Sequence, residues 1–140
     1  MPDLTASVDS CYEHETEQIV VRVLPRFLED ESTPENHRYI WAYTIAIKNM
    51  RDDAVKLMSR YWRITDQRGR VQEVRGDGVI GETPTIEPGH IFEYTSGAPL
   101  TEPSGIMEGE YSFVDAAGND LTVAIPTFSL DSPYDRASPN

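Results

Sequence analysis

The stretch that decides the fold spans residues 74–97 and reads Val-Arg-Gly-Asp-Gly-Val-Ile-Gly-Glu-Thr-Pro-Thr-Ile-Glu-Pro-Gly-His-Ile-Phe-Glu-Tyr-Thr-Ser-Gly. It begins as a strand, passes through three closely spaced glycines and two prolines, and resumes an alternating pattern at His90. Glycine tolerates positive φ angles, and proline interrupts regular backbone hydrogen bonding. The stretch therefore predicts an irregular crossing between two β elements.

Apolar and polar residues alternate on both sides of this crossing, which is the period of a β-strand. Before it we expect strands over 19–28, 39–48, 55–66 and 71–74, and after it over 90–95, 109–115 and 121–125. The clearest pattern places five large apolar residues on one face, which must be core: Tyr39, Trp41, Tyr43, Ile45 and Ile47. We expect 55–66 to pair antiparallel with 39–48.

Seven short strands separated by turn residues, with no segment of helical period, are typical of an immunoglobulin or fibronectin type III-like β-sandwich. Turn residues at 67–70 and 116–120 predict two hairpins within it. Pro25 cannot donate a backbone hydrogen bond, so it indicates a sheet edge or a bend. Trp41 and Trp62 are the expected core anchors, because aromatic side chains bury the most area.

A length of 140 residues fits one domain. The formal net charge of -12 makes nucleic acid an unfavourable partner. We expect a mobile N-terminal arm over 1–16, the sandwich over 17–132 and an extended tail over 133–140. Neither a secretory signal nor a membrane span is predicted. The single cysteine, Cys11, fits a reducing compartment, so we expect a soluble, cytoplasmic protein.

The crossing contains a match to the dinucleotide-binding pattern GxGxxG at residues 76–81. A dinucleotide site requires a helix after the third glycine, and Pro84 and Pro88 are incompatible with that helix. We interpret the glycines as residues that permit positive φ and close strand crossing. Nucleotide or pyrophosphate binding remains a disfavoured alternative, and its residues would be Gly76, Asp77, Gly78, Gly81 and Glu82.

Other chemistry has little support in the sequence. The acidic loop 77–87 contains Asp77, Glu82 and Glu87, whose oxygens suit hard cations, so a divalent-cation-binding regulator is a second alternative. Its spacing matches no known calcium loop. Ser96 lacks the surroundings of a catalytic nucleophile. We therefore predict no catalytic residues, no cofactor and no specific metal site.

Basic residues are concentrated in one segment: six of the chain's twelve lie between Lys56 and Arg75. We expect four of them to form a patch that docks an acidic partner, namely Arg60, Arg63, Arg68 and Arg70. For this patch to persist on an acidic protein, the carboxylates of Glu82, Glu87, Glu102 and Glu108 should lie at loops and on the opposite face.

Several motifs resemble the ApaG family in order and spacing: 39–49 (YIWAYTIAIKN), 60–66 (RYWRITD), 74–84 (VRGDGVIGETP), 88–89 (PG), 92–97 (FEYTSG), 109–111 (GEY) and 125–130 (IPTFSL). The resemblance covers about residues 17 to 132. It implies a fibronectin type III-like sandwich in a small bacterial cytoplasmic protein without an established enzymatic activity. It also implies a link to cobalt tolerance and magnesium efflux, and it brings no catalytic residues.

The domain also looks like one that is appended to some eukaryotic F-box proteins and to a DNA polymerase delta-interacting protein, where a binding role is the natural interpretation. We therefore predict a non-enzymatic protein–protein interaction module with an unidentified protein partner. We expect the chain itself to be a monomer or a weak homodimer.

Overall fold

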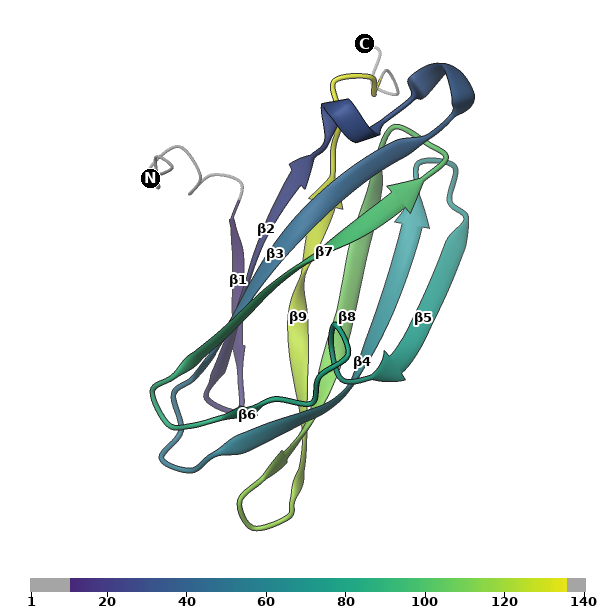
Figure 1. Ribbon diagram of the computed structural model, residues 1–140. Helices are drawn as coiled ribbons and strands as arrows, with labels where there is room; N and C mark the ends of the chain where they lie inside the picture. The colour runs from purple at the N-terminus through teal and green to yellow at the C-terminus, as the bar shows by residue number, and fades with distance from the viewer. Residues whose placement is uncertain (1–10, 136–140) are drawn as a thin grey trace, which may run out of the picture.

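Two antiparallel sheets packed face to face make up the computed structural model, which describes residues 11–135 (Figure 1). The four-stranded sheet has the order β1 (Tyr12–Thr16), β2 (Ile19–Phe27), β3 (Tyr39–Asn49) and β7 (Ile91–Leu100). The other sheet has the order β5 (Val71–Asp77), β4 (Val55–Asp66), β8 (Gly105–Asp115) and β9 (Asp120–Leu130), and β6 (Thr85–Ile86) also pairs with β4. Two short 3-10 helices, η1 (Glu29–Glu31) and η2 (Pro34–Asn36), connect β2 to β3. The predicted β-sandwich is confirmed.

The described residues contain nine strands, whereas the sequence pattern predicted about seven. The additional strands are β1, which pairs with β2, and the two-residue β6. Residues 12–16, which we expected to belong to a mobile arm, are therefore part of the sheet. Backbone pairing does not require apolar side chains, so this polar segment can pair with β2. Residues 1–10 of that predicted arm lie outside the described residues.

The C-terminal boundary also differs from the expected one at residue 132. Tyr134 packs against Phe27 and Tyr39, with ring centroids 6.0 and 6.1 Å apart, and its hydroxyl donates to Glu29. An aromatic ring that covers others in this way belongs to the domain. Residues 136–140 of the predicted tail lie outside the described residues.

The predicted pairing of 55–66 with 39–48 is wrong, because β3 and β4 belong to different sheets. The chain crosses between the sheets at Asn49, whose side chain is fully buried. Its amide nitrogen donates to the carbonyl oxygens of Asp53 and Ile86, at 2.8 and 2.9 Å, and its amide oxygen accepts from the backbone of Arg51. A buried amide satisfied by three backbone groups fixes this crossing.

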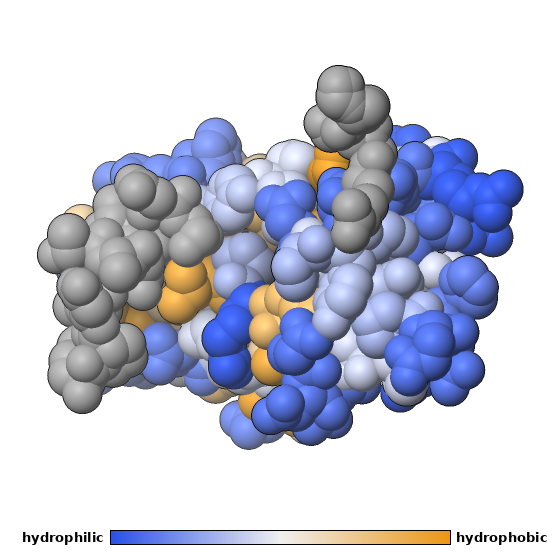
Figure 2. Space-filling view, turned by 90° about the horizontal axis from the view of Figure 1, so that it is seen from above, coloured by the Kyte–Doolittle hydropathy of each residue, from blue (hydrophilic) through white to orange (hydrophobic). Residues whose placement is uncertain are grey.

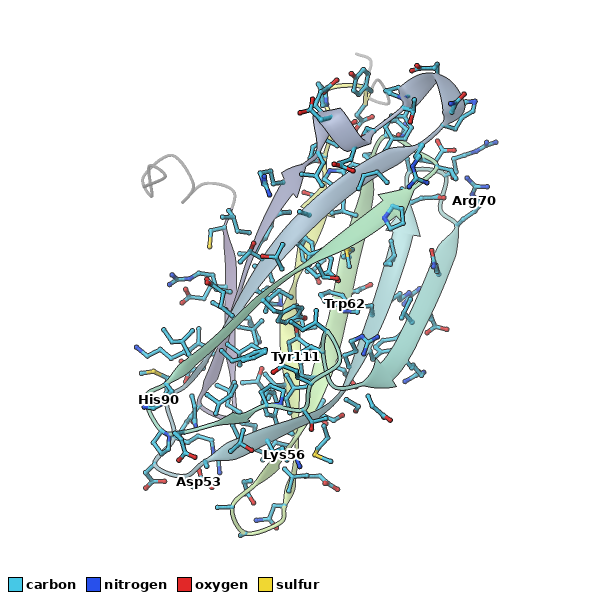
Figure 3. The ribbon with its side chains drawn as sticks, viewed as in Figure 1. Asp53, Lys56, Trp62, Arg70, His90 and Tyr111 are labelled. Atoms are coloured by element: carbon cyan, nitrogen blue, oxygen red, sulfur yellow. The ribbon has the colours of Figure 1, made fainter. Side chains whose placement is uncertain are left out.

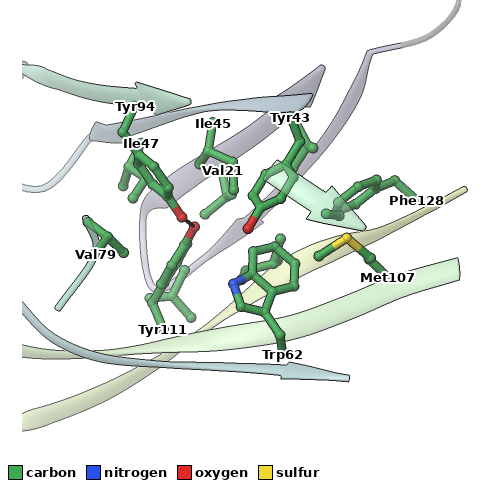
Figure 4. Packing of buried hydrophobic residues seen from close by; sticks show 14 of the residues in the cluster. Val21, Tyr43, Ile45, Ile47, Trp62, Val79, Tyr94, Met107, Tyr111 and Phe128 are labelled. Atoms are coloured by element: carbon green, nitrogen blue, oxygen red, sulfur yellow. Dashed lines mark hydrogen bonds between the residues drawn. The ribbon is translucent and has the colours of Figure 1, made fainter. Parts of the chain in front are cut away.

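Trp41 and Trp62 are both buried, as predicted, but they lie on facing sheets. The ring of Tyr43 joins the two layers by contacting Trp62 edge to face, with ring centroids 5.3 Å apart (Figure 4). Aromatic pairs of this geometry contribute beyond the area that they bury. The middle of the sandwich is therefore a layer of interlocking aromatic side chains.

A second contact between the sheets is polar. The hydroxyls of Tyr94 on β7 and Tyr111 on β8 are 2.5 Å apart in the core (Figure 4). Burial raises the pKa of both tyrosines above its ordinary value, because the ionised form would lose its hydration. Burial raises the pKa of Tyr43 in the same way.

These raised pKa values predict that the protein loses stability in alkali. The unfolded chain releases its tyrosine protons above about pH 10, whereas the folded chain retains them, so the free energy of unfolding falls as pH rises through that range. Each buried tyrosine contributes a slope of up to about 1.4 kcal/mol per pH unit. Urea denaturation between pH 8 and 11 measures it. Tyr111→Phe should reduce the slope, and an unchanged slope in that variant would contradict the assignment.

Pro25 and Pro126 lie inside strands at positions that tolerate a missing donor. Pro25 of β2 lies beyond Val23, where the pairing with β1 stops, so β2 is locally an edge strand as predicted. Pro126 of β9 lies at a register shift against β8, between the pairs Met107–Phe128 and Gly109–Ile125. Bulges are among the few places where a sheet accepts proline.

None of the described helices is long and apolar enough to cross a membrane.

Candidate interaction site

The two long sides of the sandwich differ. On one side β1 and β9 are joined, because the Tyr12 hydroxyl bonds Ser129 Oγ at 3.0 Å and the Ala124 amide donates to Thr16 Oγ1 at 3.3 Å. On the other side the edge strands are β7 and β5, and within residues 11–135 no hydrogen bond joins these two strands. We call the side between β7 and β5 the open side. The candidate residues from the sequence analysis lie on β4, in the turn 67–70 that joins it to β5, on β5 or in the segment 78–87 that follows β5.

The glycine loop, residues 76–82, is a tight turn rather than the start of a helix. Gly78 and Gly81 have φ angles of 59° and 81°, as predicted. Val79 and Glu82 exchange backbone hydrogen bonds of 2.8 and 2.9 Å. This turn places Val79, 1% exposed, in the core near Tyr94 and Tyr111 (Figure 4). The loop closes part of the open side with an apolar side chain.

Arg60 binds this loop from β4. It pairs in register with the fully buried Tyr111, so it lies on the inner face of the sheet. Its Nη1 donates to the carbonyl oxygens of Asp77 and Gly78 at 3.0 and 2.9 Å. A Cβ atom at Gly76 would lie 2.7 Å from the same nitrogen. Gly76 thus leaves room for Arg60, and Arg60 fixes the loop rather than facing a partner.

The acidic loop 77–87 does not gather its carboxylates. Asp77, Glu82 and Glu87 are all exposed. Among residues 11–135, no group of three His, Cys, Asp or Glu side chains is arranged to hold a metal ion. The segment after Gly81 leads into β6 and not into a helix, so the helix N-terminus that would bind a pyrophosphate group is missing from this loop.

The expected separation of basic and acidic residues is wrong for Glu102 and Glu108, which lie beside the basic residues, whereas Glu82 and Glu87 lie in loops as expected. Arg70 lies 3.0 Å from Asp66 and 3.2 Å from Glu102, and Arg68 lies 3.9 Å from Glu102. Arg63 of β4 has Glu73 of β5 and Glu108 of β8 as its register partners.

The cause is strand register, which sets opposite charges side by side across the sheet and brings loop 101–104 against turn 67–70. Because Arg68 and Arg70 remain 69% and 59% exposed, their ion pairs contribute little to stability. Arg70 lies at the end of the molecule, away from Trp62 and Tyr111 (Figure 3).

A groove of about 470 Å³ opens where β7 and β5 approach this end. It adjoins a smaller hollow of about 100 Å³, and Asp66, Gln72 and Leu100 line both. We call the two together the open-side groove; its remaining lining residues are Asn36, His37, Arg38, Ile64, Arg70, Val71, Pro99 and Thr101. Figure 2 shows the end of the molecule with mostly hydrophilic side chains and only small, separate hydrophobic areas. The lining of the groove combines apolar residues, among them the buried Leu100 and the exposed Val71, with polar and charged ones.

The backbone of β7 is unpaired along the open side. The backbone amide of Asn49 donates to the carbonyl oxygen of His90. The backbone N–H and C=O groups of the even-numbered residues of β7 therefore point toward β3, and those of the odd-numbered residues point away from it. Ile91, Glu93, Thr95, Gly97 and Pro99 are exposed, because these positions share the outer face of the sheet. Within residues 11–135, the amides of the first four have no hydrogen-bond acceptor.

Sequence reasoning missed this edge because it expected the strand to stop at Ser96 and Gly97. The alternation in fact continues through Pro99, whose missing N–H faces the unpaired side. An exposed proline that follows an alternating run is the signal that could have identified an edge strand.

The model of the ApaG domain matches residues 29–115, and a protein named ApaG from Rhodospirillum centenum is 51% identical over 129 residues. The chain belongs to the ApaG family. That relative is matched over 92% of this chain and 99% of its own length. The ApaG protein of Maricaulis maris is 54% identical over 125 residues, 89% of this chain and 96% of its own. A crystal structure of a Bordetella pertussis protein described as ApaA is 44% identical, with a TM-score of 0.80 over 84% of this chain and 95% of that one. The family and its sandwich fold thus agree with the resemblance found in the sequence.

Proposed function

We propose that this ApaG-family chain is a non-enzymatic protein-binding domain that receives its partner on the open side. The observation that supports the proposal most is the conjunction of the unpaired β7 edge and the open-side groove. Unpaired strand edges and grooves beside them recur where proteins recognise other chains. Of the described groove residues, Asp66 and Thr101 are both engaged by Arg70, an arrangement that does not favour catalysis.

Site-specific photo-crosslinking tests the placement. A benzoylphenylalanine residue introduced at Gln72, in the groove, should capture one defined protein in the cells from which the chain comes. The matched control is Thr122, an exposed residue of β9 on the other side of the sandwich. We expect the Gln72 product to exceed the Thr122 product by about fivefold or more, as for a site inside a specific interface rather than outside it. Equal capture from both positions would contradict the proposal.

We further expect ATP, GTP and NAD at millimolar concentration to leave the amide spectrum of residues 76–81 unchanged, because each glycine already has a role in the turn. Magnesium and cobalt should be titrated separately, since the carboxylates of Asp77 and Glu82 could respond to a metal alone. Nuclear magnetic resonance on the labelled chain is the measurement. A saturable shift confined to this loop would restore the nucleotide alternative, or the cation alternative if only a metal causes it.

A further inference from the structure

We propose that β7 binds an extended peptide of a partner protein as an additional strand of the four-stranded sheet, lying over the inner face of β5. The inference rests on the proposed function, since it specifies how the open side holds a partner. Three features of the described residues carry it: the free backbone of β7, the uncovered inner face of β5, and the charge at the end of the groove.

Between Glu93 and Pro99, the backbone of β7 is arranged as one strand of an antiparallel pair whose second strand is missing. The amides of Glu93, Thr95 and Gly97 and the carbonyl oxygens of the odd-numbered residues point away from β3. Pro99 ends the row of donors. Seven residues span about 20 Å of strand, enough to pair with a peptide of similar length.

Among residues 11–135, no strand lies opposite the inner face of β5. Gln72 and Val74 are the register partners of Ile64 and Trp62, so all four share one face of the sheet. Trp62 is 3% exposed because Tyr43 of the other sheet covers it. In contrast, Val74 is only partly buried and Gln72 is exposed. Figure 1 shows β5 at the margin of its sheet, with no strand of the four-stranded sheet in front of it.

A strand added beside β7 would occupy the missing position. It would lie about 4.8 Å from β7 within its own sheet and about 10 Å from the inner face of β5, the usual spacing of packed sheets. Its alternate side chains would then cover Val74, Gln72 and Ile64. The added strand would thus complete both the ladder and the sandwich.

A second copy of this chain fits the same edge poorly. If β7 of another copy paired there about a two-fold axis perpendicular to the sheet, its five-stranded sheet would lie on the same side as this one. That sheet would occupy the space in which β5 already extends beyond β7. A single extended segment brings no second layer and avoids this overlap, so a peptide is the occupant that the geometry favours.

The groove also indicates the chemistry of the peptide. Ile64, Val74 and Leu100 favour apolar side chains at alternate positions. Asp66 and Arg70 pair with each other, whereas the lining residue Arg38 has no ion pair with any residue that the structure describes. Arg38 precedes Tyr39, which is the register partner of Leu100, so the free cation lies at the C-terminal end of β7. An antiparallel peptide would therefore carry a carboxylate near its N-terminus.

The first experiment selects peptides from a phage-displayed library of random linear heptapeptides on the full chain. The enriched sequence, synthesised without the phage, is then added to the labelled protein and amide hydrogen exchange is followed. We expect exchange at Glu93, Thr95 and Gly97 to slow by about tenfold or more on binding, because these amides gain acceptors. Exchange at Phe92, Tyr94 and Ser96 should change little, since those amides already bond β3. Protection without this odd–even pattern, or a selection that enriches no sequence, would overturn the proposal.

The second experiment uses paired variants with the same peptide. Thr95→Pro removes an outward amide without removing a bond to β3 and should weaken binding about tenfold. Thr95→Ala removes the same contact with Thr44 but retains the amide, and should bind within about twofold. If the proline variant fails to fold, the exchange pattern of the unmodified chain decides the question.

The charged contact has its own pair of variants. Arg38→Gln should weaken an acid-containing peptide about fivefold, whereas Arg26→Gln, on an exposed part of β2, should have no effect. Sedimentation of the peptide-free chain should give a monomer. If the chain is instead a dimer in which the amides of Glu93, Thr95 and Gly97 are protected from exchange, the occupant of this edge is a second copy of the chain and the peptide proposal is wrong. If the position of Gln72 crosslinks a partner whose binding is unaffected by Thr95→Pro, the proposal of an added strand is wrong but the proposed function stands. If no partner crosslinks at this position, the proposed function is wrong as well.

Discussion

Replacing Trp41 with alanine is expected to lower the free energy of unfolding by about 3 to 5 kcal/mol, as for other large aromatic side chains removed from a core. Trp41 is 1% exposed and contacts Phe27 edge to face, with ring centroids 5.3 Å apart. Its Nε1 also donates to the carbonyl oxygen of Asp131 at 2.8 Å, which holds the end of β9 against β3. The variant therefore loses buried area, an aromatic contact and a hydrogen bond together.

Urea denaturation measures this loss. The control is Ile91→Ala, which removes an apolar side chain that is 59% exposed on β7 and should change stability by less than about 0.5 kcal/mol. A loss below about 1 kcal/mol for Trp41→Ala would mean that the site collapses around the missing ring far better than such sites usually do.

The strand over 39–49 was predictable because its alternation is strong and one face is entirely apolar. The strands that neighbour it in the sheet were not predictable. A turn of the length of 50–54 can close a hairpin or carry the chain to the facing sheet, and the two alternatives have the same alternating pattern on either side. The choice depends on the buried amide of Asn49, which reaches the distant Ile86. No local signal in the sequence reveals that contact.

The direction of Arg60 was also beyond a simple pattern. The pairing of β4 with β8 shifts by one residue between Leu57 and Ser59, so Met58 is an extra residue in a bulge. Such a bulge reverses the faces of every residue after it. Val55 and Leu57 point inward before it, and Arg60 and Trp62 point inward after it. This reversal places odd-numbered apolar residues before the bulge and the even-numbered Trp62 after it on the same inner face.

Charge placement failed for a related reason. Whether a basic segment forms a patch depends on which residues lie across from it, and that depends on the register between three strands. Arg63 lies between Glu73 and Glu108 because of this register. The composition of the segment between Lys56 and Arg75 contains no information about its neighbours, so its local positive charge did not predict a positive surface.

The second large effect is expected at Gly78, in the middle of the glycine motif. A Cβ atom there would lie 2.0 Å from the carbonyl oxygen of Glu82, and the φ angle of 59° disfavours any side chain. The backbone has to open the turn to relieve this contact, which withdraws Val79 from the core. We expect Gly78→Ala to destabilise the protein by about 2 to 4 kcal/mol, measured by urea denaturation.

The other two glycines of the motif provide matched controls. Gly81 has a φ angle of 81° but open space around its Cβ position, so Gly81→Ala should cost only about 1 to 2 kcal/mol of backbone strain. At Gly76 the obstacle is the movable guanidinium of Arg60, and Gly76→Ala should cost about 1 kcal/mol through weakened hydrogen bonds to the loop. A ligand-binding motif would instead lose ligand affinity in all three variants with similar, small changes in stability. The order Gly78, then Gly81, then Gly76 in stability alone is what separates a turn that holds Val79 in the core from a phosphate-binding loop.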